Sequence, residues 1–250
     1  AVSHAVWNAV VKSSGDRLIT MAIIMGTGGV LAIPAVFILP LPHADAWPYI
    51  AASVAIHMVY NLFLVRAYAI GDLSLIYPVA RGSAPLFVAV FAALLANEYQ
   101  NDGEIIAILV ICGGIFSLTL VGHKHAVGKK PLVYALIIGL MISLYTVADG
   151  VGARVSENAA SYIAWLFLLE CQPIIFVALW RRRGRIRRNT ARVWRAGIAG
   201  GLIANMAYGT VIWAMSVAPM AHVSALRETS VIIAALIGTR LLGEAGGKWR

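Results

Sequence analysis

The feature that most constrains this chain is an apolar segment that occurs twice, each time with an arginine inside it. The two copies are Ala67–Glu98 and Ala214–Glu244, and a constant offset of 146 residues aligns Arg81 with Arg227. An arginine within a membrane span is energetically expensive and is by default a candidate functional residue. Because both copies carry it at the same place, the sequence predicts a membrane protein built from two related halves.

The composition places the chain among membrane proteins. Of its 250 residues, 60% are hydrophobic and only 12% are charged, whereas a soluble domain carries about 25% charged residues. Eight arginines between Arg181 and Arg195 supply most of the net charge of +9. A basic cluster between two apolar runs is typical of a cytoplasmic loop, so we interpret it by the positive-inside rule and not as a nucleic-acid site.

Apolar runs of about 20 residues, enough to cross about 30 Å of hydrocarbon, predict where the chain spans the membrane. Eight complete spans are expected, at residues 18–39, 47–68, 73–96, 105–121, 131–151, 162–180, 196–217 and 223–242. The first dozen residues are apolar but too short to span, and we expect them to be the second half of a helix. The predicted fold is an all-α integral membrane protein with eight full spans and a partial first helix.

Weaker matches in the same order extend the repeat beyond the arginine segments. Their offsets drift only from 138 to 148, and the aligned pairs include Trp7 with Tyr145, Pro34 with Pro173, and Tyr60 with Tyr208. The chain then divides into repeats at residues 1–126 and 127–250. With five spans in each repeat of the parent protein, the two repeats enter the membrane in opposite senses, which is common among secondary transporters.

This pattern of an alanine-rich start, a helix break and a terminal glutamate in both copies resembles the EamA-type carriers of the drug/metabolite transporter superfamily. The resemblance covers nearly the whole chain. It implies a ten-helix bundle of two inverted five-helix repeats around a central cavity, with half of helix 1 and all of helix 10 missing from this chain. It also implies residence in the bacterial inner membrane.

The expected function is secondary transport of a small metabolite, amino acid or drug-like solute by alternating access, with proton-coupled export as one form of it. A lipid-carrier flippase of the same superfamily is the alternative, followed by an intramembrane lipid-processing enzyme. No HExxH, GxSxG or paired Asp-rich motif is present, so we predict that the chain is not an enzyme. The expected partners are the substrate, the lipid bilayer and, as one assembly state, a second copy; no nucleic acid, metal or cofactor is expected.

Polar residues that share helix faces within the predicted spans form the candidate site. Pro78 and Pro85 flank Arg81, and each removes a backbone hydrogen bond, so we expect this helix to be broken around a polar stripe. Polar and aromatic side chains of other spans are expected to complete a central cavity. The candidate substrate-binding residues are Trp7, Asn8, Tyr60, Asn61, Tyr77, Arg81, Tyr145, Asn205, Tyr208 and Arg227.

Two roles for Arg81 fit the sequence. It forms a structural ion pair with Asp149 or Glu228, or it provides a cationic site for a carboxylate-bearing solute. Arg227 and Glu228 are neighbours that point about 100° apart on a helix, so at least one of them needs a partner elsewhere. Ionisable groups within spans are also candidates for coupling protons to transport. These coupling candidates are Asp149, Glu228, Glu170 and His57.

The distribution of basic residues predicts the orientation in the membrane. We count the partial first helix as span 1 and the span at 18–39 as span 2. Lys and Arg then concentrate in the loops after spans 1, 3, 5 and 7, and the loops after spans 2, 4 and 8 have none. The positive-inside rule therefore places Arg181–Arg195 in the cytoplasm, although the family resemblance would put the termini there instead. A cysteine placed in Arg181–Arg195 should react with a membrane-impermeant thiol reagent only after the cells are permeabilised. Labelling from outside intact cells would contradict this orientation.

Overall fold

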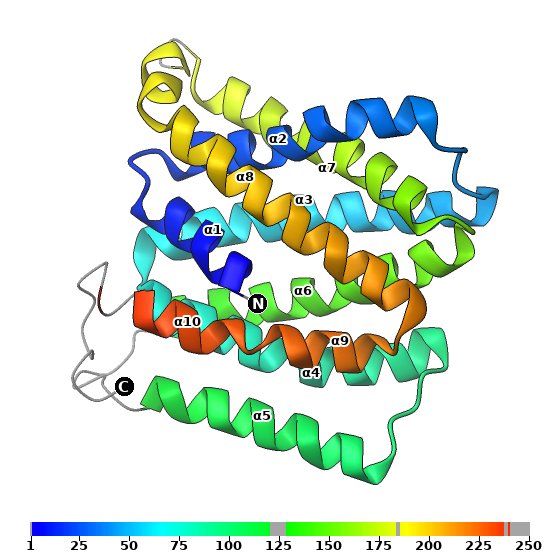
Figure 1. The fold of residues 1–250 in the computed structure, drawn as a ribbon. Helices are drawn as coiled ribbons and strands as arrows, with labels where there is room; N and C mark the ends of the chain where they lie inside the picture. The colour runs from blue at the N-terminus through cyan, green and yellow to red at the C-terminus, as the bar shows by residue number, and fades with distance from the viewer. Residues whose placement is uncertain (1, 121–128, 184–185, 238–239, 241–250) are drawn as a thin grey trace.

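The computed structural model describes residues 2–120, 129–183, 186–237 and 240. This part of the chain contains helices and no strands, arranged as one bundle (Figure 1). The helices are α1 Val2–Ser13, α2 Arg17–Ile38, η1 Ala44–Ala46, α3 Trp47–Ile70, α4 Leu73–Ala96, α5 Asp102–Leu120, α6 Lys129–Val155, α7 Ala159–Arg181, α8 Ile186–Val217, α9 Met220–Arg227 and α10 Ser230–Leu236.

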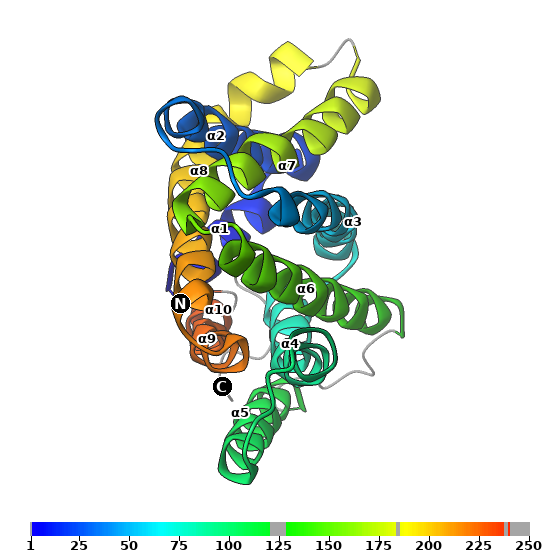
Figure 2. The same cartoon turned by 90° about the vertical axis from the view of Figure 1, so that its right-hand side faces the viewer.

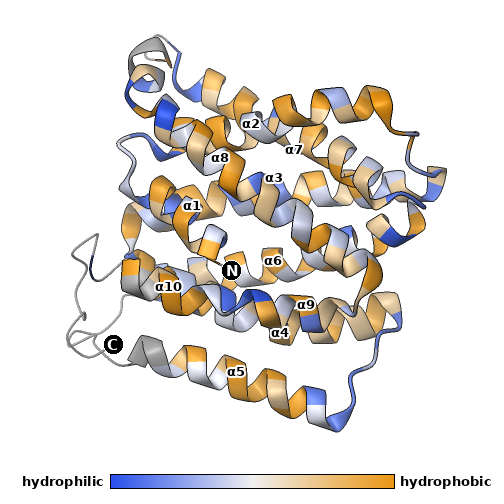
Figure 3. Ribbon diagram, viewed as in Figure 1, coloured by the Kyte–Doolittle hydropathy of each residue, from blue (hydrophilic) through white to orange (hydrophobic). Residues whose placement is uncertain are grey.

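Six of the described helical segments are long and apolar enough to cross a membrane, and they contain α2, α3, α4, α6, α7 and α8. Hydrophobic residues run along these helices, whereas hydrophilic ones gather at the connections (Figure 3). The chain is therefore all-α, and its composition and helix lengths suit a membrane protein. The predicted boundaries are close for most spans, but α8 begins at Ile186, ten residues before the predicted residue 196, because the basic stretch also adopts helix.

The helix break occurs in the second copy of the arginine segment and not in the first. The prediction of a break around Arg81 is wrong, because α4 continues through both of its prolines. In the second copy, by contrast, the predicted continuous span over 223–242 is interrupted at Glu228 and Thr229, between α9 and α10. The amide of Val231 donates to the carbonyl of Glu228 at 2.9 Å, a turn with three-residue spacing in place of the α-helical bond to Arg227. The carbonyl of Arg227 is left to accept from a side chain.

The connections separate the bundle into two chemically different ends, visible at the left and right of Figure 1. One end, here called the arginine-rich end, holds the connections 14–16, 71–72 and the segment around 181–186. The opposite, acidic end holds the connections 39–46, 97–101, 156–158 and 218–219. Its described acidic residues include Asp45, Glu98, Asp102, Glu104 and Glu157. Of the loops that the charge rule groups together, the described connections 14–16, 71–72 and 182–183 lie at one end of the bundle, and the loop over 121–128 lies outside the described residues.

The helices that carry the arginines pack in the middle of the bundle. Helix α4 packs against α6 on one side and α5 on the other, and α9 and α10 lie along it. Figure 2 shows α5 at the edge, beyond α4. Helices α2 and α7 pack against each other, α2 also packs against α8, and α3 packs against α6. This arrangement places α4 and the α9–α10 junction beside each other.

Close approach of α4 and α6 depends on Gly139. A Cβ atom at this position would lie 2.1 Å from Ser83 Oγ and 2.8 Å from the backbone carbonyl oxygen of Ala80. Small residues at such positions let membrane helices approach closely and pack their backbones against each other. In α5, by contrast, a Cβ atom on Gly113 would meet no atom within 4 Å.

We expect Gly139→Ala to destabilise the bundle by about 1–3 kcal/mol, the usual cost of overpacking a filled interior. The matched variant Gly113→Ala makes the same chemical change in open space and should leave stability unchanged or slightly higher. The thermal unfolding midpoint in detergent measures both. Equal midpoints for the two variants would mean that the α4–α6 contact is not tightly packed.

Candidate functional site

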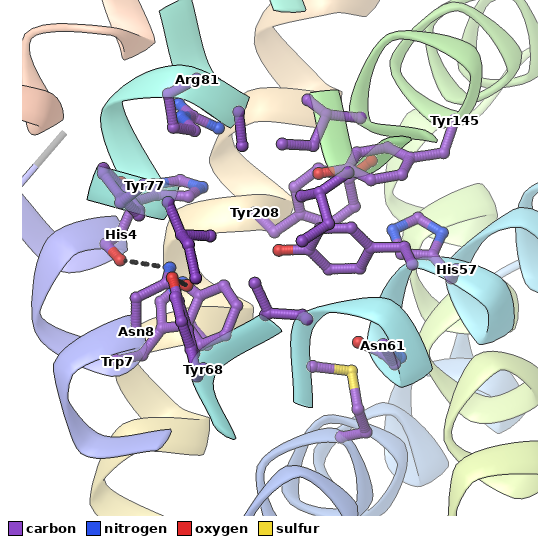
Figure 4. A pocket seen from close by; sticks show the side chains of 18 of the residues that line it. His4, Trp7, Asn8, His57, Asn61, Tyr68, Tyr77, Arg81, Tyr145 and Tyr208 are labelled. Atoms are coloured by element: carbon purple, nitrogen blue, oxygen red, sulfur yellow. Dashed lines mark hydrogen bonds between the residues drawn. The ribbon is translucent and has the colours of Figure 1, made fainter. Parts of the chain in front are cut away.

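A small cavity lies in the bundle, with side chains from α1, α2, α3, α4, α6, α7 and α8 around it (Figure 4). Its volume is about 60 Å³. The structure brings nine of the predicted substrate-binding residues together on its walls, namely Trp7, Asn8, Tyr60, Asn61, Tyr77, Arg81, Tyr145, Asn205 and Tyr208. The tenth, Arg227, lies behind the wall and contacts Arg81. Of the coupling candidates, His57 and Glu170 line the cavity.

Four aromatic rings form one side of the cavity. His57 stacks on Tyr145 with ring centroids 4.1 Å apart, and Tyr60 meets Tyr145 edge-on at 5.4 Å. Tyr208 also packs edge-on against Tyr145, at 5.6 Å. Such rings present an apolar body and a polar tip. This wall can therefore contact the apolar part of a solute while offering hydroxyl groups to its polar part.

The opposite side is held by a hydrogen-bonded link between α1 and α3. Asn8 Nδ2 donates to the carbonyl of His4 at 2.7 Å, and the Tyr68 hydroxyl donates to Asn8 Oδ1 at 2.6 Å. Neither His4 nor Tyr68 is among the predicted site residues. Tyr68 could have been found from periodicity, because it lies four residues after Leu64 and eight after Tyr60 on the same helical face.

A buried charge cluster adjoins the cavity at the α9–α10 junction. Arg81 Nε lies 2.9 Å from Glu228 Oε2, although the two groups are not aligned as a hydrogen bond. Arg81 Nη2 donates to the free backbone carbonyl of Arg227 at 3.4 Å. All three side chains are buried: Arg81 and Arg227 are each 4% exposed, and Glu228 is 1% exposed. Of the two ion-pair partners considered for Arg81, the structure therefore selects Glu228.

Arg227 is less completely paired than Arg81. Its Nη2 donates to Thr146 Oγ1 at 3.4 Å, and its Nε is 3.9 Å from Oε1 of the adjacent Glu228. Its Nε and Nη1 have no hydrogen-bond partner among the described residues. The prediction that at least one of Arg227 and Glu228 needs a partner elsewhere is confirmed, since Glu228 lies closer to Arg81 than to Arg227.

Tyr77 connects the charge cluster to the cavity wall. Its hydroxyl is hydrogen-bonded to Ser230 Oγ at 2.9 Å, which ties α4 to α10. The Arg81 guanidinium carbon is 5.9 Å from the centroid of the Tyr77 ring, within the range of a cation–π contact. Figure 4 shows Tyr77 and Arg81 on the same side of the cavity.

Two candidate residues, Asp149 and Asn205, form hydrogen bonds with groups other than the arginines. Asp149 accepts hydrogen bonds from the hydroxyls of Tyr162, at 2.9 Å, and Tyr208. Asn205 Nδ2 donates to the backbone carbonyls of Ile24, at 3.1 Å, and Gly201, at 2.7 Å. Asp149, one of the two partners considered for Arg81, therefore does not pair with it. The side chains of Asp149 and Asn205 instead stabilise contacts between helices, which the one-dimensional pattern cannot distinguish from cavity-facing roles.

Several buried polar atoms around the cavity lack a partner in the described structure. They include both amide atoms of Asn61, Nδ1 of His4 and Oε2 of Glu170. Glu170 Oε2 lies 3.6 Å from His57 Nδ1, too far for a hydrogen bond. Leaving such an atom unsatisfied costs about 1–3 kcal/mol. These groups are therefore suited to bind water or a polar solute that enters the cavity.

The cavity has room for only a few water molecules. One water needs about 10–15 Å³ of cavity volume, whereas pockets that hold small organic ligands run to about 300–1,000 Å³. The 60 Å³ cavity therefore has no room for a metabolite. A solute of that size requires the surrounding helices to move apart.

Comparison with known proteins supplies the fold but no function. No family model matches the sequence, and no curated protein matches it either. Among solved structures with a similar fold is the crystal structure of a protein that superposes with a TM-score of 0.71. The match covers 97% of this chain and 86% of the other, at 17% sequence identity. At this identity the similarity establishes a shared helical fold alone.

We expect Glu228→Gln to destabilise the protein by about 3–5 kcal/mol, because it leaves Arg81 and Arg227 buried without a carboxylate. Glu104→Gln is the matched control, since Glu104 pairs with His222 at a partly exposed position and should cost about 1 kcal/mol or less. Denaturant unfolding in micelles measures both.

The double variant Arg81→Gln/Glu228→Gln tests whether the pair acts as a unit. Removing both charges should cost less than the sum of the two single changes, because neither partner is then left buried alone. Additive effects would mean that Arg81 and Glu228 do not stabilise each other.

Proposed function

We propose that this chain is a secondary transporter, similar to the EamA-type carriers, that moves a small carboxylate-bearing metabolite, amino acid or drug-like solute by alternating access. The observation that carries the proposal is the buried Arg81–Glu228–Arg227 cluster beside an aromatic-lined cavity. Charged residues at this depth are rare and mark substrate or ion pathways. The bacterial inner membrane is the proposed location.

The charges of the cluster favour an anionic group. Two guanidinium groups face one carboxylate, and two guanidinium nitrogens of Arg227, Nε and Nη1, have no hydrogen-bond partner in the described structure. An arginine fork matches the two oxygens of a carboxylate in geometry as well as charge. A solute carboxylate can therefore replace Glu228 on Arg81 or occupy the free edge of Arg227, while its remainder packs on the tyrosines.

The packing of the helices supports an inverted repeat. In the sequence repeat, α1 corresponds to α6, α2 to α7, α3 to α8 and α4 to α9–α10. If the two halves are equivalent, each contact between two helices should recur between their counterparts. The α3–α6 contact then predicts a contact between α8 and α1, and the α4–α6 contact predicts one between α9–α10 and α1. Both α1–α8 and α1–α10 contacts are present, and α2 with α7 is its own counterpart. Two such halves can rock against each other around a fixed central site.

Ion pairs join the two halves at both ends of the bundle. At the acidic end, Arg154 pairs with Glu98 and donates to the carbonyl of Ala218 at 2.8 Å. Glu98 also accepts from the amide of Met220 at 3.0 Å. At the arginine-rich end, Arg182 Nε lies 2.7 Å from Asp16 Oδ2. Alternating access requires these contacts to open one end at a time.

Proton coupling is assigned to the carboxyl groups next to the cavity. Glu170 lies beside His57 on the wall, and Asp149 is hydrogen-bonded to Tyr208 of the aromatic side. A proton that binds at either group changes the charge around the cavity without direct contact to the arginine cluster. Transport driven by a pH gradient would be lost in Glu170→Gln if that residue carries the proton.

The decisive test is transport by arginine variants in proteoliposomes, assayed with a panel of labelled amino acids and carboxylic acids. Arg81→Ala and Arg227→Ala should each reduce transport to the background of empty liposomes. Arg81→Lys keeps the charge but loses the planar fork and should retain part of the activity. Arg183→Ala, an exposed arginine in the loop after α7, should transport like the unmodified protein.

Membrane insertion and the unfolding midpoint are measured on the same preparations, so that loss of transport is not confused with loss of fold. Full transport by Arg81→Ala would refute the proposed role of the cluster. Equal loss in the Arg183→Ala control would show that the effect is not specific to the cavity.

A further inference from the structure

A second, larger pocket opens at the arginine-rich end of the bundle. Its volume is about 600 Å³, and it lies among α2, α3, α6 and α7. It is distinct from the central cavity, because Leu64 of α3 lines the central cavity whereas Leu62 and Arg66 line this pocket. The four arginines on its wall are Arg17, Arg66, Arg181 and Arg182, and its acidic residue is Asp16.

Asp16 neutralises only one of these arginines. Its Oδ2 accepts from Arg182 Nε at 2.7 Å and from Asn189 Nδ2 at 2.8 Å. Burial alone would raise the pKa of Asp16, but the hydrogen bonds from Arg182, the Ile19 amide and Asn189 lower it below the ordinary value. Asp16 therefore stays ionised at neutral pH and is committed to Arg182.

The other three arginines have no carboxylate partner within ion-pair distance among the described residues. With four arginines and one aspartate on its wall, the pocket carries a lining charge of +3. Arg66 and Arg181 are exposed and can turn into the pocket, and Arg17 stands at the start of α2 beside it. Three free guanidinium groups around one opening form a strongly attractive site for an anion.

The rest of the pocket wall is apolar. Leu62, Phe63 and Val65 of α3 line it together with Tyr134 of α6. The rings of Phe63 and Tyr134 lie 5.3 Å apart, so they form one continuous surface between the two helices. A ligand held here would place its charge on the arginines and an apolar portion against α3 and α6.

We propose that this pocket binds a phosphate ester with a net negative charge, such as the headgroup of an anionic phospholipid. Basic pockets between membrane helices on the cytoplasmic side suit such headgroups, and arginine binds phosphate through two parallel N–H groups. The proposal concerns a site separate from the central cavity and holds whether or not the chain transports a solute.

The test measures binding of short-chain phosphatidylglycerol to the whole protein in detergent by titration calorimetry. Short-chain phosphatidylcholine, which has no net charge, should bind at least about tenfold more weakly. Arg66→Gln and Arg181→Gln should each weaken phosphatidylglycerol binding about tenfold, and together about a hundredfold, as expected for loss of one charged hydrogen-bonding group each. Arg66→Lys should fall between Arg66→Gln and the unmodified protein.

Arg192→Gln is the matched control, because it removes an equally exposed arginine at the same end of the bundle but outside the pocket. Its affinity should stay within about twofold of the unmodified protein. All variants should keep the same unfolding midpoint without ligand, since the altered side chains are exposed.

Titration with sn-glycerol 3-phosphate distinguishes a membrane phospholipid from a soluble phosphate ester as the ligand of this pocket. Binding of phosphatidylglycerol alone would assign the site to a membrane lipid, and equal binding of both would assign it to soluble phosphate esters as well. The proposal is overturned if neither binds, or if Arg192→Gln weakens binding as much as Arg66→Gln does.

Discussion

A buried ion pair between the two halves of the chain, Arg81 with Glu228, is the interaction on which the centre of the structure depends. An uncompensated arginine at membrane depth is costly, and the carboxylate that compensates it comes from the other copy of the repeated segment. The pair also explains the local backbone. Where α9 ends and α10 begins, the free carbonyl of Arg227 turns toward Arg81 and becomes its second acceptor. One arginine thus fixes the relative position of α4 and the α9–α10 junction.

The cavity follows from this arrangement and from close helix packing around it. Gly139 brings α6 against α4, and the packing of α6 against α3 places Tyr145 edge-on to Tyr60. On the far side, Gly28 of α2 leaves space for Asn205 of α8, since a Cβ atom there would lie 2.0 Å from Asn205 Oδ1. With the helices this close, only about 60 Å³ remains between the rings. The same packing that holds the polar residues together therefore keeps the cavity small, and binding a metabolite-sized solute there requires helix movement.

The asymmetry between the two ends of the bundle gives the molecule two different chemical environments. At the acidic end, Glu98 is matched by Arg154 and by a backbone amide, so its charge is locally neutralised. At the arginine-rich end, positive charge exceeds negative charge, and only Arg182 has a carboxylate partner within the pocket. The central cavity lies between an end whose charges are paired and an end with excess positive charge. The proposed transport site and the proposed anion pocket are separate sites, and neither proposal depends on the other.

The sequence by itself determined the helical class, most helix boundaries and part of the cavity lining, because these depend on apolar length and on periodicity along one helix. It identified nine residues that share the cavity and the requirement that Glu228 or Arg227 find a partner elsewhere. Only the tertiary structure decided that Glu228 and not Asp149 pairs with Arg81, and that Asn205 binds backbone carbonyls of α2 and α8. It also placed the helix break at Glu228–Thr229 and left α4 continuous despite Pro78 and Pro85. These outcomes depend on which helices lie side by side, because a lost backbone bond or a buried charge is compensated by neighbours distant in sequence.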